Sequence, residues 1–355
     1  MSDNILRDYG WNRHYETLYQ EKSTTLIPGR VTAQLTQVFR VMTAQGELLA
    51  EKTGKLQFQA ENKTELPVIG DWVLCQSDIS RKRTLIQEIL PRQSVSIRKK
   101  RDFGQARSQI LAANIDYLGI VSSLDETLNL PKIERFLTLC YESKIPPLLI
   151  FNKTDRCNDL SEQRIRLHKY FPDLNLFFTS ALTKEGIREL QDFLSPGTTL
   201  AFVGSSGAGK STLINDLYGS EILATAENRE KDQKGRHTTS HKELILLPGK
   251  SMIIDTPGLR EIALLASQDS LDSVYAHLTQ LAAQCRFSNC SHSSEPGCAV
   301  QSAIAAGDFP PEKLKNFLKQ KQEISAHDEE QQRRGNAKRH LKNIAKPLLK
   351  HKKNY

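Results

Sequence analysis

The stretch at residues 198–211 reads TTLAFVGSSGAGKS, an apolar run that ends in the pattern G-x-x-x-x-G-K-S. Glycines let the backbone curl so that successive N–H groups point at phosphate oxygens, and a helix beginning at the end of the pattern adds its positive N-terminus. The stretch therefore predicts a phosphate-binding loop that follows a buried strand and opens a helix. The loop residues are Gly204, Ser205, Ser206, Gly207, Ala208, Gly209, Lys210, Ser211 and Thr212.

Two side chains of this loop have specific expected roles. Lys210 is expected to reach the β- and γ-phosphates, and the Ser211 hydroxyl to bind Mg²⁺. A second apolar run, SMIID at 251–255, is followed by Thr-Pro-Gly. Asp255 would hold the magnesium ion, through water, and the Gly258 N–H would donate to the γ-phosphate. Together the two motifs predict a nucleoside triphosphate site that uses Mg²⁺.

The base is predicted to be guanine. Asn152-Lys153-Thr154-Asp155 closes the apolar run at 146–153. A carboxylate at Asp155 can accept hydrogen bonds from guanine N1–H and the 2-amino group, which adenine lacks. The Lys153 stem would cover the base, Asn152 would brace neighbouring loops, and a backbone N–H of Ser180-Ala181 would reach guanine O6. The four-residue pattern is short, so a chance match is the alternative interpretation.

These motifs stand in a rotated order. In ordinary regulatory GTPases the phosphate loop comes first, whereas here the base motif precedes it and Asp255–Gly258 comes last. Because the site is built from loops at one edge of a sheet, a circular permutation leaves the pocket intact. The segment after Gly258 runs directly into the C-terminal part of the chain, so nucleotide state could act on that part.

The pattern around these motifs predicts an α/β domain at 113–265. Apolar runs at 117–124, 146–153, 175–180 and 198–204 alternate with helical stretches at 131–143, 161–170 and 184–194. Such alternation is typical of a mostly parallel sheet with helices on both faces. Ligands of these sheets bind at the carboxyl ends of the strands.

A small β-barrel is predicted at 29–97, after an N-terminal extension at 1–28. β-like runs occupy 30–41, 47–52, 55–60, 71–76 and 84–90, with no clear helix among them. An oligonucleotide-binding (OB) fold fits this spacing best, and another small barrel or sheet is the alternative.

Basic residues are concentrated in two runs. The net charge is +8, and residues 331–355 contain only basic and no acidic charges; the second run, Arg98-Lys99-Lys100-Arg101, lies in a predicted basic linker at 98–112. Two such runs favour a polyanion such as RNA, although basic runs are also ordinary solvated surface. With no long apolar segment and no signal-peptide pattern, we expect a cytoplasmic protein.

A metal site is predicted at 266–330. Its four ligands follow the spacing Cys285-x₄-Cys290-x-His292-x₅-Cys298. Three thiolates and an imidazole complete a tetrahedron around one structural Zn²⁺ per chain, in a helical domain. A redox site is less favoured because there is no C-x-x-C pair.

With these motifs together, the chain resembles the family of ribosome-small-subunit-dependent GTPases A (RsgA, also called YjeQ), which are circularly permuted GTPases with an OB domain and a zinc domain. The resemblance implies binding to the small ribosomal subunit late in assembly, hydrolysis stimulated by that subunit, and release. It also identifies 235–239 as the first switch, in which Thr238, or else Thr239, would complete the magnesium shell. Leu259 stands where many GTPases have a water-orienting glutamine. The resemblance implies His237 as its substitute; a structural or RNA-contact role is the alternative.

The predicted reaction is hydrolysis of GTP to GDP and phosphate, by a monomer that binds the small subunit and its rRNA and no membrane. Two other functions remain open: a metabolic nucleoside-triphosphate enzyme, and an RNA-binding module with a vestigial GTP site. Asn152–Asp155 speaks against an ATP-using kinase, and the intact set of Lys210, Ser211 and Asp255 against a vestigial site.

Overall fold

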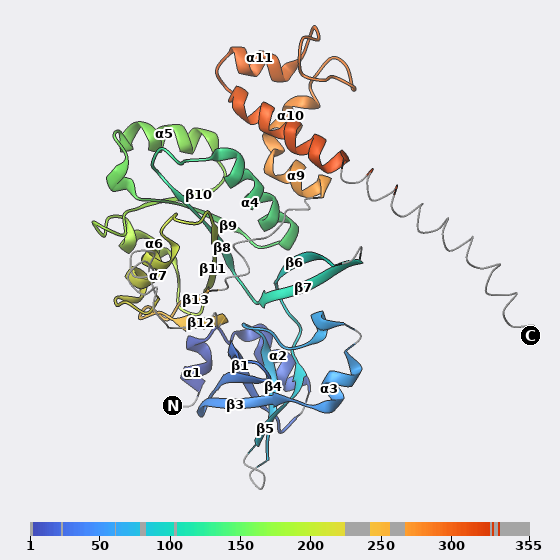
Figure 1. The fold of residues 1–355 in the computed structure, drawn as a ribbon, viewed down its shortest axis with the longest axis vertical. Coiled ribbons are helices and arrows are strands. Elements are labelled where there is room, and N and C mark those ends of the chain that lie inside the picture. Colours follow the sequence, from blue (N-terminus) through green and yellow to red (C-terminus); the bar gives the residue numbers. More distant parts are fainter. Residues whose placement is uncertain are drawn as a thin grey trace, which may run out of the picture. The chain divides into compact units, whose positions relative to one another are not determined.

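The fold was analysed in a computed structural model (Figure 1). The structure describes residues 3–22, 24–60, 62–78, 83–102, 105–223, 242–255 and 267–326, together with residues 329 and 333. The chain forms two compact units, Met1–Leu264 and Leu265–Tyr355. No helix in the described ranges has the length and apolar character needed to cross a membrane.

The N-terminal part of the first unit is a closed five-stranded barrel. Its strands are β1 (Ile27–Gln34), β2 (Val38–Thr43), β3 (Gly46–Lys52), β4 (Trp72–Asp78) and β5 (Arg83–Ile89). They pair in the order β1-β2-β3-β5-β4, and β4 pairs again with β1 to close the barrel. Two short helices, α1 (Asp3–Asp8) and α2 (Arg13–Glu21), precede it. The predicted barrel is confirmed.

Two details of the barrel prediction were wrong. The run at 30–41 is divided between β1 and β2, and the run at 55–60 is the helix α3 (Gly54–Gln59) instead of a strand. The Thr53 hydroxyl caps this helix by accepting from the Leu56 N–H at 3.2 Å. Leu56 then packs on the barrel core, while Phe58 is 92 % exposed. A helix of six residues with one inward-facing side chain has too few positions to show a helical period in the sequence.

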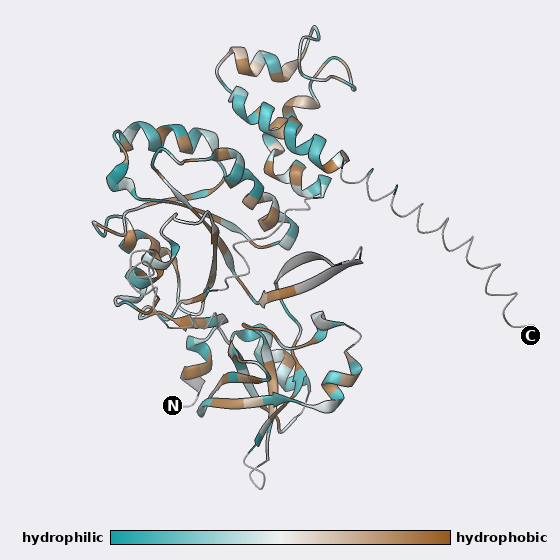
Figure 2. Ribbon diagram, in the orientation of Figure 1, coloured by the Kyte–Doolittle hydropathy of each residue, from teal (hydrophilic) through white to brown (hydrophobic). Residues whose placement is uncertain are grey.

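The second part of this unit is a five-stranded parallel sheet. Its strands lie in the order β10 (Asn175–Thr179), β9 (Pro147–Asn152), β8 (Tyr117–Ser123), β11 (Thr199–Gly204) and β13 (Met252–Asp255). Almost every residue of β8, β9 and β11 is buried, as expected for strands covered on both faces. Figure 2 colours the ribbon by the hydropathy of each residue. The predicted parallel α/β fold is confirmed.

In the described ranges, four α-helices lie between these strands along the chain. They are α4 (Leu130–Ser143), α5 (Leu160–Tyr170), α6 (Ile187–Phe193) and α7 (Lys210–Tyr218). Leu200 and Phe202 of β11 join one core cluster with side chains of α6 and α7, whereas α4 contacts β8 and β11. The strand leading to the phosphate loop is therefore held by packing over its whole length.

The strand β12 was missing from the sequence prediction. β12 (Lys242–Leu246) pairs antiparallel with β13 on one side and with β1 of the barrel on the other. The barrel and the parallel sheet thereby become parts of one eleven-stranded hydrogen-bonded network.

The stretch expected as a basic linker also has regular structure. β6 (Val95–Asp102) and β7 (Gln105–Ala113) pair antiparallel as a separate two-stranded sheet. The domain boundaries proposed from the sequence remain predictions.

The described part of the second unit is helical. It contains α9 (Gln268–Val274), α10 (Ala276–Ala282), α11 (Ala299–Ala305) and a helical segment at 311–326. A small core holds them together, with Leu271, Tyr275, Val300, Phe309 and Phe317 among its buried members.

Candidate active site and metal centre

The residues predicted to bind the nucleotide follow the carboxyl ends of adjacent parallel strands. The phosphate loop follows β11, the Asn152–Asp155 motif follows β9, and Ser180-Ala181 follows β10, while Asp255 ends β13. Because β10, β9, β8, β11 and β13 are parallel neighbours, these ends meet at one edge of the sheet (Figure 1).

The phosphate loop has the backbone conformation that its glycines predict. Gly204, Gly207 and Gly209 have φ angles of 141°, 78° and 88°. A Cβ on Gly204 would lie 2.1 Å from the Val121 carbonyl oxygen, and one on Gly209 would lie 2.3 Å from Nδ2 of Asn152. Both positions therefore exclude any side chain, through backbone conformation and through lack of space.

Lys210 begins helix α7 and is only 7 % exposed. Its ammonium group curls back over the loop, where Nζ donates to the Gly204 carbonyl at 2.9 Å and to the Ser205 carbonyl. Ser211 is the second residue of the same helix and is partly exposed. A positive charge and a hydroxyl thus stand at the N-terminus of a helix, where an anion is favoured.

Asn152 connects three of the loops. Its side chain is buried, and Nδ2 donates to the Ala208 carbonyl of the phosphate loop at 3.0 Å. Its Oδ1 accepts from the Thr179 hydroxyl at 3.2 Å and from the Ala181 N–H at 3.3 Å. The amide can do this because it offers both donors and an acceptor, which neither Asp nor Leu of similar size could. The two loops predicted to bind the base, which follow β9 and β10, are therefore fixed relative to the phosphate loop.

Asp155 lies exposed at the mouth of these loops, and its Oδ1 accepts a hydrogen bond from the Ser180 hydroxyl. Lys153 has a left-handed backbone with φ 65°. Its Nζ lies 3.6 Å from a carboxylate oxygen of Asp125, which is 14 % exposed. The structure thus places Asp155, Ser180 and Lys153 together.

Asp125 was not identified from the sequence. Although burial tends to raise the pKa of this carboxyl, hydrogen bonds from Ser123 and Thr127 and the charge of Lys153 bring its pKa well below the usual range. Its place just after β8, at the edge where the other loops meet, was the signal that could have identified it. Asp125 is ionised at neutral pH and orients Lys153.

Three predicted site residues lie outside the described residues. They are Gly258, His237 and Thr238, and with them the alternative Thr239.

The four predicted metal ligands come together in the second unit. One ligand atom each from Cys285, Cys290, His292 and Cys298 lies within 4.8 Å of the others. The Cys285 and Cys298 sulfurs are 3.9 Å apart, and each lies 3.6 Å from Nδ1 of His292. A tetrahedral zinc ion with Zn–S bonds of about 2.3 Å would separate its sulfurs by about 3.8 Å. The cluster therefore has the dimensions of a closed four-ligand metal site.

The surrounding backbone supports this cluster. Burial raises the pKa of the Cys285 thiol, but hydrogen bonds from the backbone at Val300 and Ala299 and from the thiols of Cys298 and Cys290 together outweigh it, so that this pKa is lowered. Cys298 caps helix α11, since its Sγ accepts from the Gln301 N–H at 3.4 Å. Burial, in contrast, raises the pKa of the Cys290 thiol to about 11, and a divalent metal that binds cysteines as thiolates would displace its proton.

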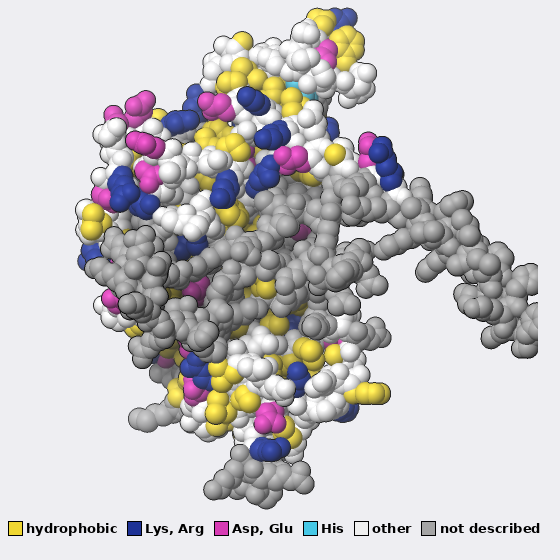
Figure 3. Space-filling model, in the orientation of Figure 1, with side chains coloured by type: hydrophobic (Ala, Val, Ile, Leu, Met, Phe, Trp, Pro, Cys, Tyr) yellow, Lys and Arg dark blue, Asp and Glu magenta, His cyan; other side chains and the backbone are white. Residues whose placement is uncertain are grey.

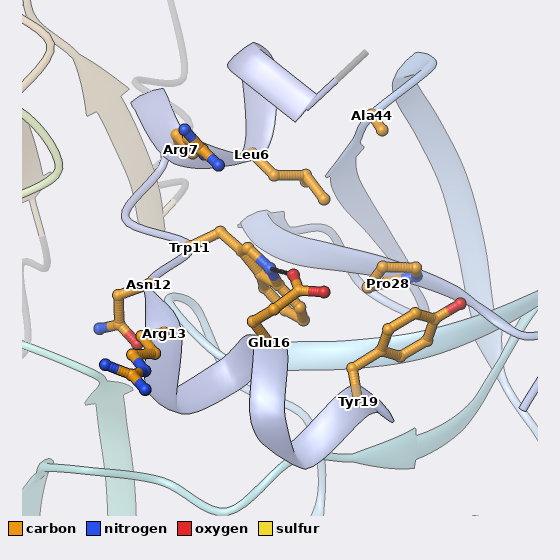
Figure 4. A pocket seen from close by; sticks show the side chains of 9 residues that line it. All are labelled: Leu6, Arg7, Trp11, Asn12, Arg13, Glu16, Tyr19, Pro28 and Ala44. Atoms are coloured by element: carbon orange, nitrogen blue, oxygen red, sulfur yellow. Dashed lines mark hydrogen bonds between the residues drawn. The ribbon is translucent and has the colours of Figure 1, made fainter. Parts of the chain in front are cut away.

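A pocket of about 650 Å³ lies in the first unit (Figure 4). It is formed by the N-terminal helices and the barrel, and in it Trp11 Nε1 donates to Glu16 at 2.7 Å. None of the predicted nucleotide or metal residues lines it. Its lining consists of Leu6, Arg7, Trp11, Asn12, Arg13, Glu16, Tyr19, Pro28 and Ala44.

Comparison with known proteins agrees with this geometry. A family model described as RsgA GTPase matches residues 89–265. A relative from Lactiplantibacillus plantarum, named small ribosomal subunit biogenesis GTPase RsgA 2, is 40 % identical over 304 residues, which cover 86 % of this chain and 85 % of the relative. The chain belongs to the RsgA GTPase family.

Further relatives support this membership. The RsgA 1 protein of Listeria innocua is 37 % identical over 91 % of this chain and 90 % of its own length. Among solved structures, YjeQ from Thermotoga maritima superposes with a TM-score of 0.62 at 23 % identity, covering 84 % of this chain and 98 % of that one. At such identity the likeness shows the fold alone. This RsgA-family protein is a GTP hydrolase, as the motifs predicted.

Proposed function

We propose that this GTPase binds the small ribosomal subunit as a late assembly factor, that the subunit stimulates GTP hydrolysis, and that hydrolysis is coupled to release. The names of the relatives support this assignment, since they describe small ribosomal subunit biogenesis GTPases. A metabolic kinase or a vestigial site agrees less well with the base motif and the phosphate loop.

One observation carries the nucleotide assignment. Asn152, from the base motif, donates to Ala208 of the phosphate loop and accepts from Ala181 of the third loop. Motifs that stand in rotated order along the chain thus meet around one buried amide. A guanine beside Asp155 and phosphates above Lys210 would be held in fixed relation.

Each side chain of the site has a proposed role in hydrolysis. Asp155 accepts from the guanine base, Lys210 neutralises charge on the β- and γ-phosphates, and the backbone N–H groups of the loop donate to their oxygens. Ser211 and Asp255 would hold Mg²⁺, with Thr238 completing its shell. That ion supplies charge stabilisation to the phosphates when bound.

Two further assignments concern residues outside the described ranges. Gly258 would donate to the γ-phosphate, and His237 would take the place of the water-orienting glutamine that Leu259 cannot provide. Among the described residues, we also assign nucleotide binding to the phosphate loop from Gly204 to Thr212 and to Asn152, Lys153, Ser180 and Ala181.

We assign Zn²⁺ to the cluster of Cys285, Cys290, His292 and Cys298. Soft thiolate and imidazole ligands in a closed set favour a structural zinc ion over Mg²⁺ or Ca²⁺. The cysteines pack against the small core of the second unit. The ion would therefore stabilise that unit.

The barrel, the zinc-binding unit and the basic runs would contact ribosomal RNA. On the face shown in Figure 3, the described Lys and Arg side chains are interspersed with Asp and Glu. The proposed phosphate contacts therefore rest on the runs at 98–101 and 331–355, and binding should weaken as salt rises. We further propose a cytoplasmic monomer that cycles between GTP and GDP.

The decisive experiment is a turnover assay with and without purified small ribosomal subunits. A large stimulation is expected. Equal rates would favour a metabolic enzyme, and no turnover in either condition would favour an RNA-binding module with an inactive site. A steep fall in subunit binding between low and physiological salt is the accompanying expectation.

A further inference from the structure

A buried arginine joins the barrel to the strands that carry the nucleotide loops. Arg30 belongs to β1 of the barrel, yet it is only 2 % exposed. Its Nη2 donates to the Thr199 hydroxyl and to the Asn114 carbonyl, each at 2.9 Å, and its Nη1 lies 3.4 Å from Sδ of Met252. Thr199 begins β11 and Met252 begins β13.

The same guanidinium also binds the barrel side of this junction. Nε donates to the Gly70 carbonyl at 3.3 Å, Nη1 donates to the Tyr9 carbonyl, and the group lies 5.4 Å from the centre of the Trp72 ring. One planar group with five N–H donors thus connects five chain segments. A lysine or an aliphatic side chain could not reach all of them.

The partners of Arg30 are themselves cross-linked. Tyr15 of helix α2 donates to Asn114 Oδ1 at 2.9 Å, and Asn114 Nδ2 donates to the Gly70 carbonyl at 3.0 Å. Asp116 accepts from the Thr199 N–H at 2.7 Å, and burial lowers the pKa of Arg30 to about 10 while the Asp116 charge opposes that shift. Breaking this network would leave buried carbonyls without a donor.

The junction and the nucleotide loops occupy opposite ends of the same two strands. β11 begins at Thr199 and ends at Gly204 of the phosphate loop, and β13 begins at Met252 and ends at Asp255. At about 3.3 Å per residue, β11 spans roughly 16 Å. These strands are buried, so a displacement at their start is carried to their end.

Other contacts also cross this boundary. β1 and β12 share only two residue pairs, Ala33 with Glu243 and Gln34 with Lys242. Arg40 pairs with Glu243 and Lys250 with Asp8, but these ion pairs are partly exposed and contribute little. Buried hydrogen bonds also join Tyr15 to Asn114, Asn114 to Gly70, and the Ala113 N–H to the Ile69 carbonyl. Among the described contacts, the bond from Arg30 to Thr199 links the barrel directly to the phosphate-loop strand.

We propose that Arg30 is a positioning residue that transmits small-subunit binding at the barrel to the nucleotide loops, through Thr199 and Met252. This inference rests on the proposed function. In this proposal Arg30 couples RNA binding to hydrolysis without contacting the nucleotide.

The test is steady-state GTP turnover of the full-length, zinc-loaded protein with increasing small-subunit concentration. For Arg30→Met, we expect turnover at saturating subunits to fall about tenfold or more, while turnover without subunits changes by less than about twofold. The subunit concentration giving half-maximal stimulation should stay within about threefold of the wild-type value, since Arg30 is buried and touches no RNA. Arg30→Lys should restore part of the stimulation.

Two further variants keep the result interpretable. Thr199→Val removes only the hydroxyl that accepts from Arg30 and should lower stimulated turnover about threefold, so it decides the question if Arg30→Met does not fold. Arg40→Gln breaks an exposed ion pair at the same boundary and should leave both rates unchanged.

Unchanged stimulation in Arg30→Met, or in Thr199→Val if the former does not fold, would overturn the inference. Equal losses of basal and stimulated turnover would also overturn it, because they indicate a purely structural residue. Wild-type protein that subunits do not stimulate would instead refute the proposed function, and this inference with it.

Discussion

The nucleotide loops of the first unit and the metal cluster of the second are assembled in opposite ways. The nucleotide residues are spread from Asn152 to Asp255 and are brought together by the order of parallel strands. The metal ligands all lie within residues 285–298 and surround a point defined by local turns beside a small core. The first site lies at the edge of a large sheet whose hydrophobic core is formed mostly by other residues, whereas the metal-binding cysteines themselves belong to or pack against the small core of the second unit.

This difference predicts that substitutions at the two sites have different effects. Substitutions in the nucleotide loops should lower GTP binding or hydrolysis while the protein stays folded. Substitutions in the metal cluster should unfold the second unit while the first keeps its nucleotide binding.

The largest effect is expected from Cys290→Ser. Loss of a ligand should release the metal and unfold the second unit, because structural zinc contributes roughly 10–16 kcal/mol in small domains. Zinc content by elemental analysis and amide hydrogen exchange across 267–326 measure this. Cys157→Ser, at a cysteine of the first unit, should retain the metal, and one full equivalent of zinc in Cys290→Ser would contradict the site.

Lys210→Ala should lower kcat by about 10³-fold or more, since a buried cation aimed at the phosphates is lost. The midpoint of thermal unfolding should change little, because the sheet beneath the loop remains packed. The control is Lys132→Ala, at an exposed lysine of α4. Wild-type turnover in the Lys210 variant would show that the phosphates bind elsewhere.

Asp155→Asn should weaken the binding of GTP relative to that of other nucleotides by about 10²-fold, because a charge-assisted hydrogen bond contributes about 1.5–3 kcal/mol. An amide at this position can donate to the 2-oxo group of xanthine, so XTP should become the better substrate. Competition binding of GTP, XTP and ATP provides the readout, with exposed Asp173→Asn as the control. An unchanged preference for GTP would mean that another group reads the base.

Asp125→Asn should produce the smallest change, an increase of about threefold in the KM for GTP. Asp125 and Lys153 form a partly exposed ion pair, and such pairs contribute about 0.2–1 kcal/mol. A double-mutant cycle with Lys153→Met isolates that contribution. Additive effects in the cycle would show that Asp125 does not orient Lys153.

The sequence predicted the elements of the parallel sheet well because strands buried on both faces form continuous apolar runs. Prediction was poorer where structure depends on partners. The helix α3 has only six residues, and β12 is a strand only because β13 and β1 lie on either side of it. Asp125 carries no recognisable motif, and only its position beside Lys153 identifies it.

The sequence by itself determined the local chemistry of this protein. Loop glycines with Lys210 and Ser211, the carboxylate of Asp155 and the spacing of four metal ligands act over a few residues, so they are visible in the chain. The tertiary structure decided how these pieces are connected. Only the strand order brings Asn152 to Ala208, and only the packing of the barrel against the parallel sheet places Arg30 beside Thr199. Such contacts depend on residues far apart in the chain, and no local pattern records them.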